Sequence, residues 1–278
     1  MATQSAEDTI SPMHTTHRPV GDLLRDWRQR RRRSQLDLAL DAEVSARHLS
    51  FIETGRAQPS REMVLRLAEH LEVPLRERNA LLMAAGYAPV YSATPLDEPE
   101  MDAARQAIDL LLAGHEPYPA LAVDRHWNLV AANRAVGIFL AEIPQELLTP
   151  PLNVLRLSMH PEGLAGRIIN SAQWRDHVLH RLRQQVEATA DPGLEELLAE
   201  LRAFPSPPAD TRTHEPVIHD SVAFPLRMRS SIGELAFYTT TTVFGTATDV
   251  TLAELAIESF VPANAETAAL LQGAAKEG

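Results

Sequence analysis

Residues 34–60, SQLDLALDAEVSARHLSFIETGRAQPS, contain the side chains whose type and spacing point most clearly to a chemistry. The stretch includes three serines that can cap the first turn of a helix, namely Ser34, Ser45 and Ser60. In the helix after Ser45, Leu49 and Ile52 would face inward and Arg47 would face outward. An outward arginine on a short helix can donate to a guanine edge or to a phosphate. The pattern predicts a helix-turn-helix whose second helix enters the DNA major groove.

The residues expected to contact DNA are Gln35, Ser45, Ala46, Arg47, His48, Ser50, Phe51, Arg56 and Arg61. Gln35 begins the first helix of the motif, where free amides and the positive dipole end favour a phosphate. An ordinary exposed helix start is the alternative for this residue. Phe51 is apolar on a face that should be wet, which fits contact with a thymine methyl group or packing on the domain's own surface. Glu53 is acidic and fits a local cap or ion pair better than DNA contact.

Charge is distributed unevenly along the chain. Although the formal net charge is −11, residues 18–86 carry 13 arginines against 10 acidic residues. Residues 87–278 carry 13 basic and 25 acidic residues. The arginines at 30–33 could add electrostatic affinity for DNA, or could simply form a solvated helix end. Positive charge confined to the N-terminal part is a hint that this part contacts nucleic acid.

Composition excludes several other classes of protein. The chain has no cysteine, which rules out disulfides and thiolate metal sites. No apolar run approaches the 18 residues or so that a transmembrane helix needs. Residues 1–17 are polar and acidic and are expected to be a disordered tail. They also lack the basic start and apolar core of a signal peptide, so a cytoplasmic location without membrane attachment is the expectation.

Helical periodicity and turn residues predict five short helices within residues 18–86. Pro19 can occupy the first turn of the first helix. Gly55 is expected as the left-handed residue that ends the third helix. Pro74 would open the fifth helix, and Gly86 would end it. The result is a compact all-α domain.

A second domain is expected at residues 101–265, after a proline-rich linker at 87–100 and before a C-terminal tail at 266–278. Helices are expected at 101–112, 172–186 and 194–201. Asn153 is expected to cap a further helix. Strands are expected at 119–123, 127–133, 217–228, 234–244 and 253–261. An N-terminal hairpin, inserted helices and a three-strand meander predict an α+β domain with a five-stranded antiparallel sheet.

Two family resemblances run through these segments. Ser34-Gln35, Leu38-Ala39, Val44-Ser45, Ile52-Glu53 and Pro59-Ser60 resemble the lambda-repressor-like, or Xre-type, helix-turn-helix domain. The segments RHLSFIETGRAQPSREM, LRERNALLMAAGYAP, HEPYPALAVDRHWNLVAAN, NVLRLSMHPEGLAGRI and FGTATDVTLAELAIESFVPA resemble regulators with an MmyB-like ligand-binding domain. The resemblance implies a transcriptional regulator that binds an operator as a homodimer. It also implies a PAS-like second domain whose apolar pocket takes a fatty acid or acyl compound.

An acyl ligand needs an apolar tube and one or two polar groups at its head. The apolar candidates are Phe139, Leu155, Leu157, Met159, Ile168, Trp174, Val178, Phe237 and Phe244. The head-group candidates are Asn133, Arg156, His160, Arg167 and His177. An arginine would suit a carboxylate through a bidentate contact. The alternatives are ordinary core positions, surface ion pairs and, for Asn133, a cap on the helix that follows.

No pattern of catalytic residues stands out. His177 and His180 lie three apart on an expected helix, but no H-E-x-x-H motif accompanies them. Neither a G-x-S-x-G elbow nor a phosphate-binding glycine loop occurs. We therefore expect no enzyme, no metal and no cofactor other than a possible bound fatty acid. The alternative for the second domain is a dimerisation or protein-partner module without a ligand.

Overall fold

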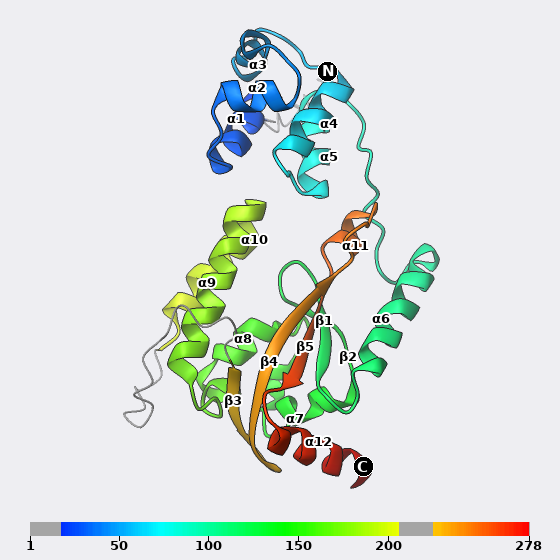
Figure 1. Cartoon of the computed structure of the whole chain (residues 1–278), viewed down its shortest axis with the longest axis vertical. Helices are drawn as coiled ribbons and strands as arrows, with labels where there is room; N and C mark the ends of the chain where they lie inside the picture. The colour runs from blue at the N-terminus through cyan, green and yellow to red at the C-terminus, as the bar shows by residue number, and fades with distance from the viewer. Residues whose placement is uncertain (1–17, 206–224, 278) are drawn as a thin grey trace, which may run out of the picture. The chain divides into compact units, whose positions relative to one another are not determined.

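The chain forms two compact units, Met1–Val90 and Tyr91–Gly278. The computed structural model describes residues 18–205 and 225–277, and Figure 1 shows the helices and strands of both units. The division between the units falls inside the stretch 87–100 that the sequence marks as a linker. Each unit has its own buried core.

The first unit is all helical, as predicted. Its helices are α1 (Val20–Arg30), α2 (Gln35–Asp41), α3 (Ala46–Glu53), α4 (Arg61–His70) and α5 (Leu75–Ala84). Each of the three predicted serine caps is confirmed, because each side chain accepts a hydrogen bond from the backbone three residues later. Ser34 also takes part in a capping box with Asp37. Local sequence signals therefore fix where α2, α3 and α4 begin.

Close packing between α1 and α3 sets the position of the third helix. Leu24, Leu49 and Ile52 are almost completely buried between the helices. A Cβ atom at Gly21 would lie 2.3 Å from the backbone oxygen of Ile52, so only glycine permits this approach. Gly55 has a φ of +70°, which confirms it as the left-handed residue after α3.

The second unit is built on a five-stranded antiparallel sheet, as predicted. Its strands are β1 (Ala120–Val123), β2 (Leu129–Ala132), β3 (Pro225–Ser230), β4 (Gly233–Val243) and β5 (Ala256–Pro262). They lie in the order β2-β1-β5-β4-β3, with every neighbouring pair antiparallel. The hairpin of β1 and β2 therefore joins the C-terminal meander through β5.

Helices of the second unit cover both faces of this sheet (Figure 1). They are η1 (Pro99–Met101), α6 (Asp102–Gly114), η2 (Arg134–Val136), α7 (Gly137–Leu140), η3 (Gln145–Leu148), α8 (Val154–Met159), η4 (Pro161–Ala165), α9 (Ser171–Thr189), α10 (Pro192–Ala203), α11 (Val250–Ala253) and α12 (Ala265–Glu277). Side chains of β1 alternate between the faces. Ala120 and Ala122 pack with Ile108 of α6, whereas Leu121 and Val123 join the larger core that includes α9 and α10. No helix within residues 18–205 and 225–277 is long and apolar enough to cross a membrane.

Three sequence expectations need correction. Residues 265–277 form α12 rather than a tail, because Thr267 and Leu271 are buried and Thr267 Oγ1 accepts a hydrogen bond from the Ala236 amide of β4. The last strand begins at Ala256, since Asp249 caps the short helix α11 before it. Asn133 does not cap η2 through its side chain. It donates instead to the carbonyls of Leu112 and Tyr118 and so joins the end of α6 to the start of β1.

Two expected features fall outside the described residues. They are the disordered tail at 1–17 and the first part of the strand expected at 217–228, of which Pro225–Ser230 is observed as β3.

Candidate DNA-binding helix and candidate ligand cavity

Helix α3 presents the outward face that the sequence predicts. Ser45 Oγ accepts a hydrogen bond from the His48 amide at 3.1 Å, which starts the helix. Leu49 and Ile52 are buried, while Arg47 is exposed. The other expected contact residues on α3, which are Ala46, His48 and Ser50, are partly exposed, and Arg61 is exposed at the start of α4. Their contact with DNA stays a prediction.

Two arginines lie next to the aromatic ring of Phe51. The guanidinium carbon of Arg47 lies 5.3 Å from the ring centroid, and that of Arg56 lies 6.0 Å away. Such contacts attract a cation to the face of the ring. Phe51 is only partly buried. The structure thus gathers three of the expected DNA-contact residues on one surface, with Phe51 packed beneath two positive charges.

Behind this face, a buried network holds the end of α3. Arg28 donates two hydrogen bonds to the Glu53 carboxylate, at 2.6 and 2.9 Å. Gln35 Nε2 donates to the same carboxylate at 2.8 Å, and Arg25 donates to the Glu53 carbonyl at 2.8 Å. Glu53 therefore pairs locally, as expected. Gln35 also holds α2 against α3, a role that its sequence position did not reveal.

The pKa of the Glu53 carboxyl reflects this network. Burial alone would raise it, but the hydrogen bonds from Arg28 and Gln35 and the positive charges of Arg28 and Arg25 outweigh that effect. The pKa consequently lies below its ordinary value. The carboxylate is ionised at neutral pH and keeps both of its side-chain donors.

The arginine run at 30–33 is largely engaged within the unit. Arg31 donates to the carbonyls of Leu71 and Glu72, at 2.9 and 3.0 Å, beyond the end of α4. The guanidinium groups of Arg30 and Arg31 also lie near the ring of Trp27. Arg33 pairs with Asp41. These contacts favour a role in holding the helices together over that of a simple solvated helix end.

A cavity lies on the inner face of the second unit's sheet, under α8 and α9. The space open to the centres of water-sized molecules is about 80 Å³. The lining consists of Leu121, Trp127, Leu129, Val136, Phe139, Leu140, Leu152, Val154, Leu155, Leu157, Ser158, Leu164, Ile168, Trp174, His177, Val178, Arg181, Leu226, Met228, Thr239, Glu258 and Phe260. Aliphatic and aromatic side chains dominate this wall.

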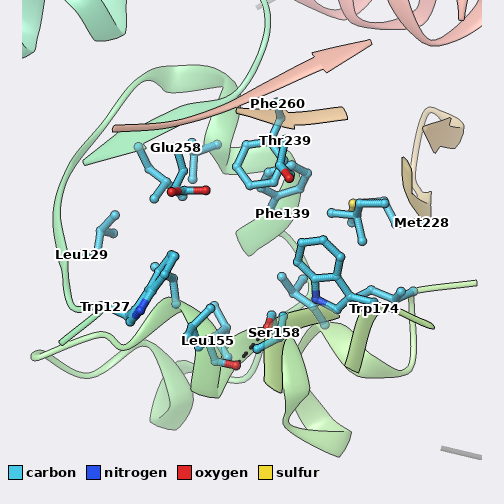
Figure 2. A pocket seen from close by; sticks show the side chains of 18 of the residues that line it. Trp127, Leu129, Phe139, Leu155, Ser158, Trp174, Met228, Thr239, Glu258 and Phe260 are labelled. Atoms are coloured by element: carbon cyan, nitrogen blue, oxygen red, sulfur yellow. Dashed lines mark hydrogen bonds between the residues drawn. The ribbon is translucent and has the colours of Figure 1, made fainter. Parts of the chain in front are cut away.

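Figure 2 shows how the sheet and the helices share the lining. Trp127 and Trp174 lie on opposite sides of the cavity. Glu258 approaches from the strands, and Leu155 and Ser158 approach from α8. The cavity is therefore bounded by residues far apart in the sequence.

Several predicted ligand residues do line this cavity. They are Phe139, Leu155, Leu157, Ile168, Trp174, His177 and Val178. Three predicted apolar residues do not. Phe237 is completely buried among aromatic neighbours, and Met159 is buried in the core beside the cavity. Phe244 follows the last residue of β4 and packs against the core on the opposite face of the sheet.

Four of the predicted head-group residues also lie away from the lining. Arg156 pairs with Glu200 on α10 at 2.6 Å. Arg167 donates to backbone carbonyls of residues 138, 139, 141 and 229, so its charge ties loops together. His160 accepts a hydrogen bond from the Glu162 amide, and its ring packs on Phe204. Asn133 serves the backbone at the start of β1, as described above. Local spacing could not show these tertiary partners.

An ion pair on the cavity wall joins two residues that no local sequence pattern brings together. Arg181 of α9 donates to both oxygens of Glu258 on β5, at 2.6 and 2.9 Å. Arg181 also donates to Thr241 Oγ1 at 2.6 Å, and its guanidinium lies 4.5 Å from a Trp127 ring centroid. The available signal was the alternation of β5, which places Glu258 on the same face as Phe260. A carboxylate at an inward position needs a partner.

Trp174 and His177 form a second polar corner of the cavity. Their rings stack with centroids 5.6 Å apart. Burial, followed by the nearby positive charge of Arg181, lowers the pKa of the His177 imidazole below its ordinary value. The buried Nε1–H of Trp174 has no hydrogen-bond partner among the described residues. By contrast, Trp127 Nε1 donates to Gln185 at 2.7 Å.

Within the described ranges, no group of three or more histidine or acidic side chains is arranged to hold a metal ion. The i, i+3 pair of His177 and His180 lies on α9, with His177 facing the cavity and His180 exposed. These two residues therefore do not share one site with a further ligand.

Two family models match the chain, one for each unit. The model for the MmyB-like transcription regulator ligand binding domain matches residues 104–273. A helix-turn-helix domain model matches residues 19–81. No curated protein is similar enough to the chain to count as a match. The ligand-binding match covers the whole sheet and the cavity, and the helix-turn-helix match covers α1 to α4 and most of α5.

Proposed function

Because the chain belongs to the family of MmyB-like transcription regulators, we propose that it binds an operator through α3 and an acyl compound, such as a fatty acid or its derivative, in the cavity of the second unit. The two family-model matches identify the chain as a ligand-responsive transcription regulator. The ligand class and the residues that read DNA are the parts proposed here.

The cavity is the observation that carries the ligand class. Its wall is formed mostly by aliphatic and aromatic side chains, and its few polar groups include the paired Arg181 and Glu258. A site of this kind binds apolar molecules by burying their surface, and the polar groups set the orientation of the ligand. An acyl chain with one polar end matches both features.

The exposed side of α3 is the proposed reading surface for DNA. Arg47 is exposed one turn from the capped start of the helix, where recognition helices contact base edges. Arg56 follows the end of α3 and lies near the same Phe51 ring as Arg47, and we propose that it contacts a phosphate. A homodimer would present two such helices to half-sites about 34 Å apart, one turn of DNA.

One experiment tests both proposals on the full chain. An operator would first be selected from a random DNA pool, and its affinity would then be measured with and without octanoate or methyl octanoate. We expect at least one of these probes to change operator affinity, since a regulator's ligand must bind its two states unequally. Equal affinity in all three conditions would contradict the acyl proposal.

The DNA surface has its own test. Arg47→Ala should weaken binding to the selected operator by about 1–3 kcal/mol, while binding to unrelated DNA changes far less. A uniform loss on both DNAs would show that Arg47 contacts only phosphate.

A further inference from the structure

The proline-rich linker is hydrogen-bonded to the second unit where it enters that unit. Asp249 Oδ2, at the start of α11, accepts from the Ser92 hydroxyl at 2.8 Å and from the Thr94 hydroxyl and amide at 2.8 and 3.0 Å. In return, the Val250 amide donates to the Ser92 carbonyl at 2.7 Å. Hydrogen bonds to an ionised acceptor are stronger than neutral ones. We call these contacts the linker clamp.

The two carboxylate oxygens of Asp249 have different partners. Oδ1 accepts from the amides of Thr251 and Leu252 and so caps α11. Burial alone would raise the pKa of the Asp249 carboxyl, but the hydrogen bonds from the linker and from Leu252 outweigh that effect. The pKa therefore lies below its ordinary value, and the carboxylate is ionised at neutral pH. The linker donors can be removed while the cap of α11 stays in place.

The clamp attaches the linker to the connection between two strands of the cavity wall. Helix α11 lies between β4, which contributes Thr239 to the lining, and β5, which contributes Glu258 and Phe260. Figure 1 shows α11 at the end of β4, beside the segment that enters the second unit. Leu96 of the linker also packs against the core that contains Ile257, the sequence neighbour of Glu258. A shift of these strands would therefore act on the linker at two places.

The clamp lies very close in sequence to an anchor on the first unit. The Val90 amide donates to Asn79 Oδ1 of α5 at 3.0 Å. The clamp begins at Ser92, so one residue of sequence, Tyr91, separates the two anchors. The division between the two units falls between Val90 and Tyr91. A movement of α11 would thus reach the chain within two residues of the DNA-binding unit.

Building on the proposed function, we propose that the linker clamp makes operator affinity depend on occupation of the cavity. Occupation shifts β4 and β5, α11 moves with these strands, and Asp249 moves the linker. Asp249 is thus a positioning residue for the response to ligand, because it lies outside the cavity lining. Contiguous hydrogen-bonded and packed groups of this kind can couple two distant sites.

A double variant of the linker tests the clamp on the full chain. Ser92→Ala with Thr94→Val removes two of the three linker donors and leaves Asp249 to cap α11. In the wild type, we expect saturating octanoate to change affinity for the selected operator by at least about fivefold. In the double variant, the change should fall below about twofold. Thr94→Ser is the matched control, because serine keeps the hydroxyl donor and should keep the wild-type response.

Ligand affinity distinguishes lost coupling from damage to the second unit. Octanoate binding would be measured without DNA by equilibrium dialysis. The double variant should bind octanoate within about twofold of the wild type, because neither Ser92 nor Thr94 lines the cavity. If the double variant bound octanoate much more weakly, the clamp would support the cavity itself and the coupling proposal would be wrong.

A substitution in the cavity wall provides a second arm that needs no added ligand. Thr239→Leu places a larger side chain in the cavity from β4. It should change operator affinity in the otherwise wild-type chain and have little effect in the double variant. Equal changes in both backgrounds, with octanoate or with Thr239→Leu, would overturn the role of the clamp. An operator affinity that responds to neither would also overturn it.

The two arms separate this proposal from the proposed function. A response to Thr239→Leu that requires the clamp, without any response to octanoate or its methyl ester, supports the clamp and contradicts the acyl ligand. A response to octanoate that persists in the double variant supports the acyl ligand and contradicts the clamp.

Discussion

Among the residues that the structure describes, each unit contains an enclosed Arg–Glu pair, and the two pairs differ in what lies beside them. Arg28 and Glu53 have side-chain exposures of 11% and 0%, and Arg181 and Glu258 have 27% and 6%. In both pairs the arginine donates to both carboxylate oxygens. The first pair is packed between helices, whereas the second borders a cavity.

This difference shows that a buried ion pair does not by itself mark a functional site. The Arg28–Glu53 pair receives a further donor from Gln35 and fixes the three helices of the DNA-binding motif. The Arg181–Glu258 pair has open space beside it, so its charges act on whatever enters. An Arg–Glu pair stabilises the fold where the packing around it is complete. Where a cavity adjoins the pair, its charges also influence which ligand can bind.

The largest expected effect comes from removing one arginine from each pair. Arg28→Met should lower the free energy of local unfolding of the first unit by roughly 3–5 kcal/mol, because Glu53 would stay enclosed without its main partner. Arg181→Met should cost less, about 1–3 kcal/mol, since Glu258 borders the cavity and keeps the Thr241 hydrogen bond. Hydrogen exchange read separately in α1–α3 and in β4–β5 measures both changes.

Controls for this comparison come from an exposed pair and a double variant. Arg18→Ala removes a solvent-exposed pair with Asp26 and should cost about 0–1 kcal/mol. The double variant Arg28→Met with Glu53→Leu should recover much of the lost stability, because no charge is left unpaired. If Arg28→Met and Arg181→Met lowered the free energy of local unfolding equally, the distinction between the two pairs would be wrong.

A smaller effect is expected in ligand preference. Glu258→Gln leaves the positive charge of Arg181 on the cavity wall without a neutralising carboxylate. Octanoate at pH 8 should then bind about tenfold more tightly than to the wild type, equivalent to ~1.4 kcal/mol. Methyl octanoate should change little. Equilibrium dialysis of octanoate and methyl octanoate with the wild type and with Glu258→Gln measures both affinities.

Glu200→Gln is the matched control for that experiment. It frees Arg156 in the same way, but Arg156 does not line the cavity. Octanoate affinity should therefore stay at the wild-type value. An unchanged octanoate affinity in Glu258→Gln would show that the ion pair does not govern ligand charge.

The smallest expected effect is the pH dependence of the first pair. The pKa of Glu53 is lower in the folded protein than its ordinary value of 4.5, so the unfolded state binds more protons as the pH falls. The stabilisation is complete above pH 4.5 and is lost as the pH falls through the folded-state pKa. Amide hydrogen exchange in α1–α3, corrected for intrinsic exchange rates, should show the free energy of local unfolding falling with pH below pH 4.5. The slope should be reduced in the double variant that lacks both charges.

Much of the fold was predictable from the sequence, because its signals are local. Serine caps, Gly55 and helical spacing predicted the helices of the first unit, and alternation in the β segments predicted the antiparallel sheet. The end of the chain was not predicted correctly. Its helix α12 depends on docking Thr267 and Leu271 against the sheet, and contacts so distant in sequence leave no local pattern.

The sequence by itself determined which residues could face DNA and which apolar segments could surround a ligand. Helix and strand periods fix the direction of a side chain relative to its own element, and this suffices for Arg47 and Phe139. Only the tertiary structure decided which charges neutralise each other. Arg156 pairs with α10, Arg167 holds backbone carbonyls, and Arg181 meets Glu258 across 77 residues of chain. The polar character of the cavity follows from these pairings, because a charge acts on a ligand only when no nearer partner has already neutralised it.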